Sequence, residues 1–244
     1  MYGSTSRLLL ALGSGLILSC SNSGPMPVSP LITHPLQADS KQSCFEGVWY
    51  NPKEQFIWDS PRKSVYVAPV NIDYVKARFP KEAPALAEQF RTELKKDIAR
   101  VLENRSRQTG GKIRWRVIDK PRPGCITLYI AMVKLKPTDV GGNIMSDLVS
   151  LASPLPGTSL LLGSYMKGDV GIEGRLSDRS TGASIMEFKA YNTDPITLFS
   201  VKEFERFAFD RQNLKDFASG ISSIFKDGPS SYIPQTGQFD LDPF

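Results

Sequence analysis

Residue types that commonly do chemistry in proteins are scarce in this chain. It contains three cysteines and one histidine, His34, among 244 residues. His34 lies in a proline-rich stretch before the first expected strand, so a Ser-His or Cys-His pair would have no base in the folded domain. No Cys-x-x-Cys pair and no His-rich spacing typical of a metal site is present. We therefore expect no catalytic residue, no bound metal and no cofactor.

Two carboxylates near an expected turn, Glu173 and Asp178, are the remaining candidates for acid–base chemistry. Asp178 opens the sequence Asp-Arg-Ser-Thr-Gly, where aspartate is typical of a turn residue. The glycines at positions 168, 171 and 174 lie inside an expected strand, not between a strand and a helix, which argues against a phosphate-binding loop. The sequence therefore predicts a protein that is not an enzyme.

The N-terminal segment predicts export and lipid attachment. An apolar run from Leu8 to Leu18 is too short to span a membrane, which takes roughly 20 residues, and suits a signal-peptide core. The run leads into Ile17-Leu18-Ser19-Cys20, which resembles the lipobox of bacterial lipoproteins. This resemblance implies cleavage before Cys20 and acyl chains such as palmitate on that cysteine. An ordinary secretory signal with a coincidental cysteine is the alternative. Ser21, where an aspartate would suggest inner-membrane retention, favours the outer membrane and a domain facing the periplasm.

Composition divides the chain into four expected segments. Residues 1–19 are the signal peptide, residues 20–43 a Pro- and Ser-rich tether, residues 44–226 a single domain, and residues 227–244 a poorly ordered tail. The formal net charge is +5 and the isoelectric point about 9.0. In an envelope protein this mild excess of positive charge suits contact with anionic lipid or polymer, and nucleic acid is not an expected partner.

The periodicity of apolar residues predicts an α+β domain. Helices are expected over residues 84–104 and 209–226, and strands over residues 64–72, 112–118 and 125–135, with a hairpin over 168–190. Pro69 within the first strand indicates an edge position or a bulge. The strand over 125–135 is apolar on both faces and is expected to be central. The prediction is a mixed, mostly antiparallel sheet with two main helices packed on it.

Cysteine pairing gives one candidate covalent link. If Cys20 carries lipid, Cys44 and Cys125 remain as an even pair in an oxidising compartment, where disulfides form and persist. A Cys44–Cys125 disulfide is the favoured interpretation, and two buried free thiols are the alternative.

Two surfaces are candidate binding sites. Basic residues on two adjacent strands and their connection could meet lipid phosphates or an anionic glycan, or form an ordinary solvated face; they are Arg114, Arg116 and Lys134, with Lys120, Arg122 and Lys136 nearby. The apolar stretch over residues 141–163 could contact a lipid or a partner, or simply cover the sheet; its marked residues are Ile144, Leu148 and Leu161.

Three stretches resemble an uncharacterised family of Gram-negative lipoproteins, the domain of unknown function 3313. They are Gly168–Gly182 with its Asp-x-x-Thr-Gly turn, Ile130–Thr138, and Val67–Ile72. The resemblance extends over roughly residues 60–226, while the spacer at 141–157 is longer than the family pattern. It implies an envelope location and a compact α+β fold, and it brings no activity and no catalytic residue.

These observations lead to one functional expectation and two rivals. The first is an outer-membrane-anchored lipoprotein whose domain acts as a non-catalytic binding module for a protein or lipid partner in the envelope. The second is a carrier or sensor of an apolar ligand that uses residues 141–163. A hydrolase with an atypical site is the weakest of the three.

Overall fold

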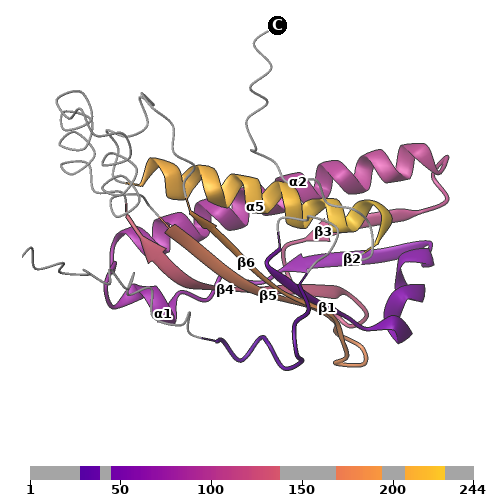
Figure 1. Cartoon of the computed structure of the whole chain (residues 1–244). Helices are drawn as coiled ribbons and strands as arrows, with labels where there is room; N and C mark the ends of the chain where they lie inside the picture. Colours follow the sequence, from indigo (N-terminus) through magenta and orange to yellow (C-terminus); the bar gives the residue numbers. More distant parts are fainter. Residues whose placement is uncertain (1–27, 39–44, 138–168, 194–206, 229–244) are drawn as a thin grey trace, which may run out of the picture.

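Six strands and three α-helices make up the described parts of the computed structural model, which are residues 28–38, 45–137, 169–193 and 207–228 (Figure 1). In chain order the elements are β1 (Gly47–Tyr50), the 3₁₀ helix η1 (Pro52–Asp59), β2 (Arg62–Val67), α1 (Asp73–Lys76), α2 (Glu82–Gln108), β3 (Arg114–Ile118), β4 (Ile126–Lys136), β5 (Asp169–Asp178), β6 (Ser184–Thr193) and α5 (Ala208–Asp227).

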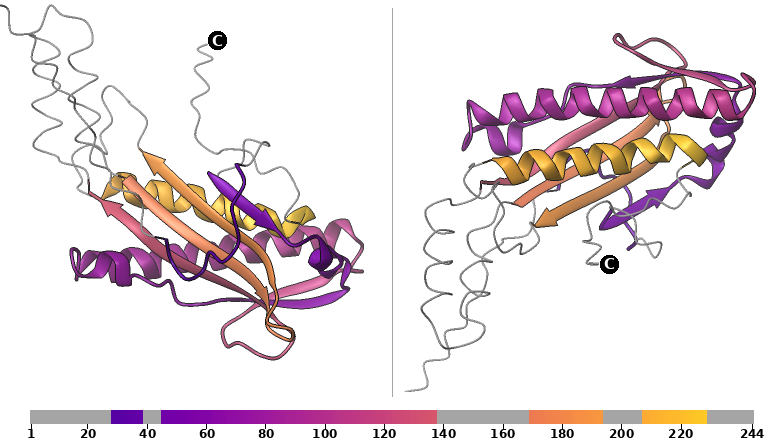
Figure 2. Two further views of the ribbon diagram at one scale, coloured as in Figure 1. Left: turned by 60° about the horizontal axis from the view of Figure 1, so that its bottom comes forward. Right: turned by 90° about the horizontal axis from the view of Figure 1, so that it is seen from above.

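The strands form one mixed sheet in the order β1-β6-β5-β4-β2-β3. The pairs β1–β6, β6–β5 and β5–β4 are antiparallel, whereas β2 runs parallel to both of its neighbours. Both α2 and α5 lie side by side on one face of the sheet (Figure 2, right). This arrangement confirms the predicted α+β class and the mostly antiparallel sheet with two main helices packed on it.

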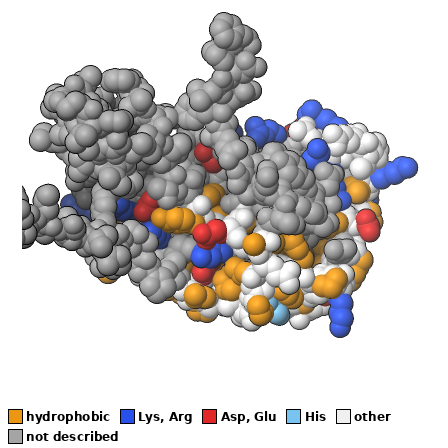
Figure 3. Space-filling model, in the orientation of Figure 1, with side chains coloured by type: hydrophobic (Ala, Val, Ile, Leu, Met, Phe, Trp, Pro, Cys, Tyr) orange, Lys and Arg blue, Asp and Glu red, His pale blue; other side chains and the backbone are white. Residues whose placement is uncertain are grey.

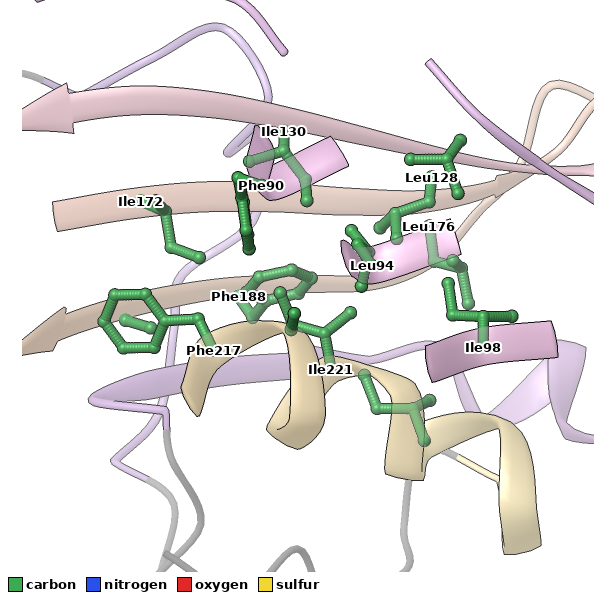
Figure 4. Packing of buried hydrophobic residues seen from close by; sticks show 14 of the residues in the cluster. Phe90, Leu94, Ile98, Leu128, Ile130, Ile172, Leu176, Phe188, Phe217 and Ile221 are labelled. Atoms are coloured by element: carbon green, nitrogen blue, oxygen red, sulfur yellow. The ribbon is translucent and has the colours of Figure 1, made fainter. Parts of the chain in front are cut away.

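The core lies between the two long helices and the sheet. Apolar residues three or four apart bring one stripe of each helix onto the strands, and alternate strand residues meet them. Figure 4 shows this contact, with side chains from five elements pointing toward one another: Phe90, Leu94, Ile98, Leu128, Ile130, Ile172, Leu176, Phe188, Phe217 and Ile221. Strand β4 is buried along nearly its whole length, as predicted for the strand over 125–135.

Strand register determines which side chains share a face. Directly paired residues point to the same face, and successive residues of one strand point to opposite faces. Leu128 and Leu176 are paired and both belong to the core under the helices. Residues one position away therefore lie on the opposite side, which we call the outer face. From β3 to β6 the outer face carries Arg116, Ser64, Tyr66, Thr127, Tyr129, Arg175 and Glu187.

The first expected strand differs from its prediction in both length and place. Strand β2 ends at Val67, so Pro69 lies beyond it instead of within an edge strand or a bulge. β2 is an interior strand between β4 and β3. The chain leaves the ladder gradually, because the backbone N–H groups of Ala68 and Asn71 still donate to carbonyls of β4.

Residues 28–38 are bound to the sheet, although they belong to the stretch predicted as a tether. We call them the docked segment, and they lie on the outer face, away from α2 and α5 (Figure 2, left). Gln37 pairs with Val48 of β1 through two backbone hydrogen bonds of 2.8 and 2.9 Å. The ring of His34 stacks on Trp49 with 3.6 Å between ring centroids. For residues 28–38 the predicted tether is corrected, because specific contacts hold them to the sheet, while the rest of the stretch 20–43 lies outside the described residues.

Two buried carboxylates supply most of the polar contacts between the docked segment and the sheet. The backbone N–H of Ser29 donates to Oε2 of Glu173 at 2.6 Å. The backbone N–H groups of Thr33 and His34 donate to Oε2 of Glu187 at 2.7 and 2.9 Å. The Thr33 hydroxyl donates to the other oxygen, Oε1, at 2.6 Å. Each carboxylate therefore satisfies backbone donors of a segment that has no regular structure of its own.

The environment of Glu187 keeps it ionised. Burial raises the pKa of this carboxyl, but the hydrogen bonds from Thr33 and His34 outweigh burial and lower the pKa to about 2. Its side chain is completely buried, while the ring of His34 is 40% exposed. Figure 3 shows the histidine at the surface beside apolar side chains. The negative charge of Glu187 is thus covered by the docked segment and does not reach solvent.

Candidate anion-binding site

A groove of about 640 Å³ is lined by basic residues of β2, β3 and the connection from β3 to β4. Its lining residues are Arg62, Lys63, Ser64, Arg114, Arg116, Arg122, Pro123 and Gly124. A hollow of this volume accommodates a small organic ligand or a lipid headgroup. We call it the basic groove.

Strand alternation places the arginines of β3 in the groove. Trp115 is buried, and its Nε1 donates to the carbonyl of Ser60 at 2.8 Å. Arg114 and Arg116, on either side of it, therefore point to the outer face and are exposed. The same register sets Arg62 directly opposite Arg114, and Ser64 directly opposite Arg116.

The pairing of Arg62 with Arg114 places like charges opposite each other on adjacent strands. Such strands are about 4.8 Å apart, and like charges in this position destabilise a sheet. None of the four groove arginines forms an ion pair with a carboxylate of the described residues. A bound anion would relieve this repulsion, since guanidinium groups bind carboxylates and phosphates through two hydrogen bonds at once.

Two groove residues are fixed in place by neighbouring side chains. The guanidinium of Arg122 donates to the hydroxyl of the buried Ser64. Nζ of Lys63 donates to Oδ2 of Asp178 at 3.0 Å and lies 3.5 Å from the carbonyl of Gly124. Burial raises the pKa of Asp178, but the hydrogen bonds from Ser180 and Lys63 outweigh it, so the pKa lies below its ordinary value. The positive charge of Lys63 is thus balanced by Asp178, and the excess positive charge of the groove comes from its arginines.

The structure brings together only part of the basic patch predicted from the sequence. Arg114 and Arg116 line the groove, as does Arg122. Lys134 lies near the other end of β4, where its Nζ donates to the Tyr191 hydroxyl at 2.9 Å and approaches Asp169 at 3.4 Å. The prediction that Lys134 joins the patch is therefore wrong, because it lies far along the strand from Ile126 and is already paired with an acid.

Arg62 and Lys63 line the groove but were not among the predicted site residues. The local signal was present, since two adjacent basic residues open the strand β2. What the sequence did not reveal is that β2 and β3 are parallel neighbours, which depends on the crossover through α1 and α2. That pairing brings two groups of basic residues, distant from each other in the chain, onto one surface.

Strand register argues against the predicted Cys44–Cys125 disulfide. Cys125 is buried and its thiol is free, while Cys44 falls outside the described residues. Glu46, two residues after Cys44, donates its backbone N–H to the carbonyl of Lys189. Lys189 is aligned through Glu173 with Ala131 of β4, which follows Cys125 by six residues. Three strand spacings separate β1 from β4. Together these offsets place Glu46 roughly 24 Å from Cys125 at the usual strand spacings. Two residues span only about 7 Å, so the strand register gives the predicted bond no support.

Several other predicted residues lie outside the described part of the chain. They are Cys20, the proposed lipid acceptor, and the apolar candidates Ile144, Leu148 and Leu161. Among the helices that the structure describes, none combines the length and the apolar character that crossing a membrane requires.

The two carboxylates considered for acid–base chemistry do not share a site. Glu173 lies on the outer face and accepts from Ser29, whereas Asp178 opens the turn between β5 and β6. Oδ1 of Asp178 accepts from the backbone N–H of Ser180 at 2.7 Å, and the turn ends at Gly182 with a φ of 71°. Asp178 is therefore a turn residue, as the sequence predicted.

Comparison with known proteins finds similar solved structures but no sequence relative. No family model and no curated protein matches the chain. Protein XCC0632 from Xanthomonas campestris, of family DUF330, is 13% identical over 72% of this chain and 89% of its own, with a TM-score of 0.34. PelC from Paraburkholderia phytofirmans, a dodecamer, is 10% identical over 66% and 88%, with a TM-score of 0.31. Lipoprotein GNA1162 from Neisseria meningitidis is 9% identical over 62% and 96%, with a TM-score of 0.25. At these values the likenesses assign no function to this chain.

Proposed function

We propose that this chain is a lipid-anchored protein of the bacterial outer membrane whose periplasmic domain is a non-catalytic module that binds an anionic component of the envelope. The observation that carries the binding role is the basic groove, where four arginines without a carboxylate partner among the described residues line one hollow. The lipid anchor rests on the lipobox-like sequence ending at Cys20. Membership of the domain of unknown function 3313 stays a prediction of the sequence motifs.

The groove favours an anion with at least two negative charges. Four guanidinium groups in one hollow repel one another, and a single negative charge would offset only part of this repulsion. Charge-assisted hydrogen bonds from arginine are worth about 1.5–3 kcal/mol each. Phosphate groups offer several acceptor oxygens in the geometry that arginine matches.

Removing two groove arginines is expected to weaken binding of a small polyanion by about tenfold or more, because each lost guanidinium removes a charge-assisted hydrogen bond. Inorganic pyrophosphate is titrated calorimetrically into the full mature chain carrying Cys20→Ser, with and without Arg62→Gln/Arg116→Gln. Affinity of the parent chain should fall as salt is raised.

A matched control removes the same charge elsewhere. Arg100→Gln/Arg107→Gln deletes two exposed arginines of α2 that pair with Asp97 and Glu103. We expect this variant to bind pyrophosphate with nearly the affinity of the parent chain. Equal weakening in both double variants, or no binding by the parent, would show that the groove is not the binding site.

Attachment of lipid is tested independently of the groove. Cells that produce the full chain should incorporate radioactive palmitate into it, and the Cys20→Ser variant should incorporate none. Labelling that persists without Cys20 would contradict the anchor and leave the binding role to be judged by calorimetry alone.

The carrier hypothesis has less support. Its residues, 141–163, lie outside the described part of the chain, and the 640 Å³ groove is lined by cations instead of apolar side chains. Native mass spectrometry of the purified chain separates the two functions, since a stoichiometric acyl ligand would favour the carrier.

A further inference from the structure

The outer face combines two features that sit on different strands. The docked segment is held over β5 and β6 by Glu173 and Glu187. The basic groove lies on β2 and β3, toward the opposite edge of the sheet. The register places Glu187, Ser64 and Arg116 on the same face, opposite the helices. The docked segment therefore lies on the same face of the sheet as the groove.

Docking shortens the free part of the chain between the lipid and the domain. Ser29 is the first residue with a described contact to the sheet, and it follows Cys20 by only nine positions. A link of this length spans at most about 30 Å when fully extended and about 17 Å as a flexible coil. A tether extending to residue 43 would reach about 25–30 Å as a coil and leave the domain free to turn.

Exposed charge differs between the two sides of the molecule. On α2, basic residues are matched by acids one turn away, in the ion pairs Glu88–Arg91, Glu93–Lys96, Asp97–Arg100 and Glu103–Arg107. On the outer face, Glu173 and Glu187 are buried beneath the docked segment. The groove arginines consequently leave positive charge without a carboxylate partner among the described residues on that face, and its sign complements an anionic surface.

We propose that the outer face lies against the membrane that anchors the chain, with the basic groove binding phosphate groups of anionic phospholipids in that same membrane. This inference rests on the proposed anchor at Cys20. The short link holds the outer face near the headgroups, and the groove then binds them at a high effective concentration. The lipid chain and the groove are two membrane attachments, which together fix the distance of the domain from the membrane and its orientation.

Photo-crosslinking tests the orientation directly. The photoreactive residue p-benzoylphenylalanine replaces either Tyr66, a partly exposed aromatic residue of the outer face, or Lys96, an exposed residue of α2. The full lipidated chain is reconstituted in vesicles of phosphatidylcholine, with or without phosphatidylglycerol, and lipid adducts are quantified by mass spectrometry. With phosphatidylglycerol present, we expect several-fold more lipid adduct at Tyr66 than at Lys96.

Variants connect the orientation to its two causes. Arg62→Gln/Arg116→Gln should lower the adduct at Tyr66 several-fold while the chain still floats with the vesicles, because the acyl anchor is unchanged. Glu187→Gln should lower the Tyr66-to-Lys96 ratio, because release of the docked segment lengthens the free link. Circular dichroism verifies that each variant is folded.

The outcomes separate this inference from the proposed function. Equal adducts at the two positions in a chain that floats and binds pyrophosphate would overturn the membrane-facing orientation and leave the anchored binding module intact; the ligand would then be a free anion or a glycan. A chain that fails to float would lack the anchor, and the orientation would be overturned with it.

Discussion

Replacing Glu187 by glutamine is expected to release residues 28–38 from the sheet. Both carboxylate oxygens accept hydrogen bonds: Oε2 from the backbone N–H groups of Thr33 and His34, and Oε1 from the hydroxyls of Thr33 and Ser184. A glutamine amide keeps one acceptor oxygen but replaces the other with an NH₂ group, which is itself a donor. That NH₂ group would face the N–H or O–H donors that one carboxylate oxygen now accepts from. Hydrogen–deuterium exchange of residues 28–38 should therefore rise by about tenfold or more, while exchange in β4 and α2 stays slow.

Acid stability should report the same interaction. The pKa of Glu187 in the folded chain is about 2, below the value of roughly 4.3 for a free glutamate. A lowered pKa in the folded state stabilises the fold above the unfolded pKa, and this stabilisation is lost as the pH falls from about 4.5 to 2. A difference of one in pKa between the folded and unfolded chain corresponds to about 1.4 kcal/mol, so about 3 kcal/mol of the free energy of unfolding should disappear over this window.

A control variant separates Glu187 from general loss of negative charge. Glu46→Gln removes an acid next to β1 that forms an ion pair with Lys189 and is about half exposed. Exposed pairs contribute about 0–1 kcal/mol. Urea unfolding from neutral pH down to about pH 2 should show the acid-dependent loss in the parent chain and in Glu46→Gln, and a much smaller loss in Glu187→Gln. The same steep loss in all three chains would mean that another group is responsible.

Gly174→Ala is expected to be among the most destabilising single changes in the core. A Cβ atom at this position of β5 would lie 2.1 Å from Cζ of Phe188, whose ring covers the glycine from β6. Phe188 is completely buried and contacts Phe45 at 4.7 Å between ring centroids, so its ring has little room to move. Overpacking of this kind costs about 3 kcal/mol, which chemical unfolding would measure.

A double-mutant cycle identifies the cause. Phe188→Leu removes the ring that the new methyl group would meet and costs stability of its own. If the clash is responsible, Gly174→Ala should cost at least about 1 kcal/mol less in the Phe188→Leu background than in the parent chain. Strictly additive costs would instead indicate that glycine is needed for its backbone.

Much of the fold could be predicted because its longest elements obey simple periods. The apolar stripe over 84–104 corresponds to α2, and that over 209–226 to α5, each within a few residues. The double-sided apolar pattern over 125–135 correctly indicated a central strand. These elements are stabilised by their own patterned faces, so local sequence carries the information.

The parts that were not predicted depend on distant residues. The prolines in residues 21–43 favoured a tether, yet this stretch contains the docked segment. That segment is held by Glu187, which follows Thr33 by 154 positions in the chain. Nothing in its own composition indicates that a carboxylate will receive its backbone N–H groups. The basic groove likewise depends on β2 and β3 becoming neighbours, which fixes Arg62 opposite Arg114 only in the finished sheet.

The positions of β1 and the docked segment affect the order in which contacts form as the chain folds. β1 pairs with β6, and the contacts from Ser29 to Glu173 and from Thr33 to Glu187 close loops of 144 and 154 residues. Contacts so distant along the chain form late, because their loops must close first. Until β5 and β6 have been made, the docked segment has no surface to bind. On the proposal that Cys20 is lipidated after export, this order of contacts would keep the docked segment off the sheet while the cysteine is processed.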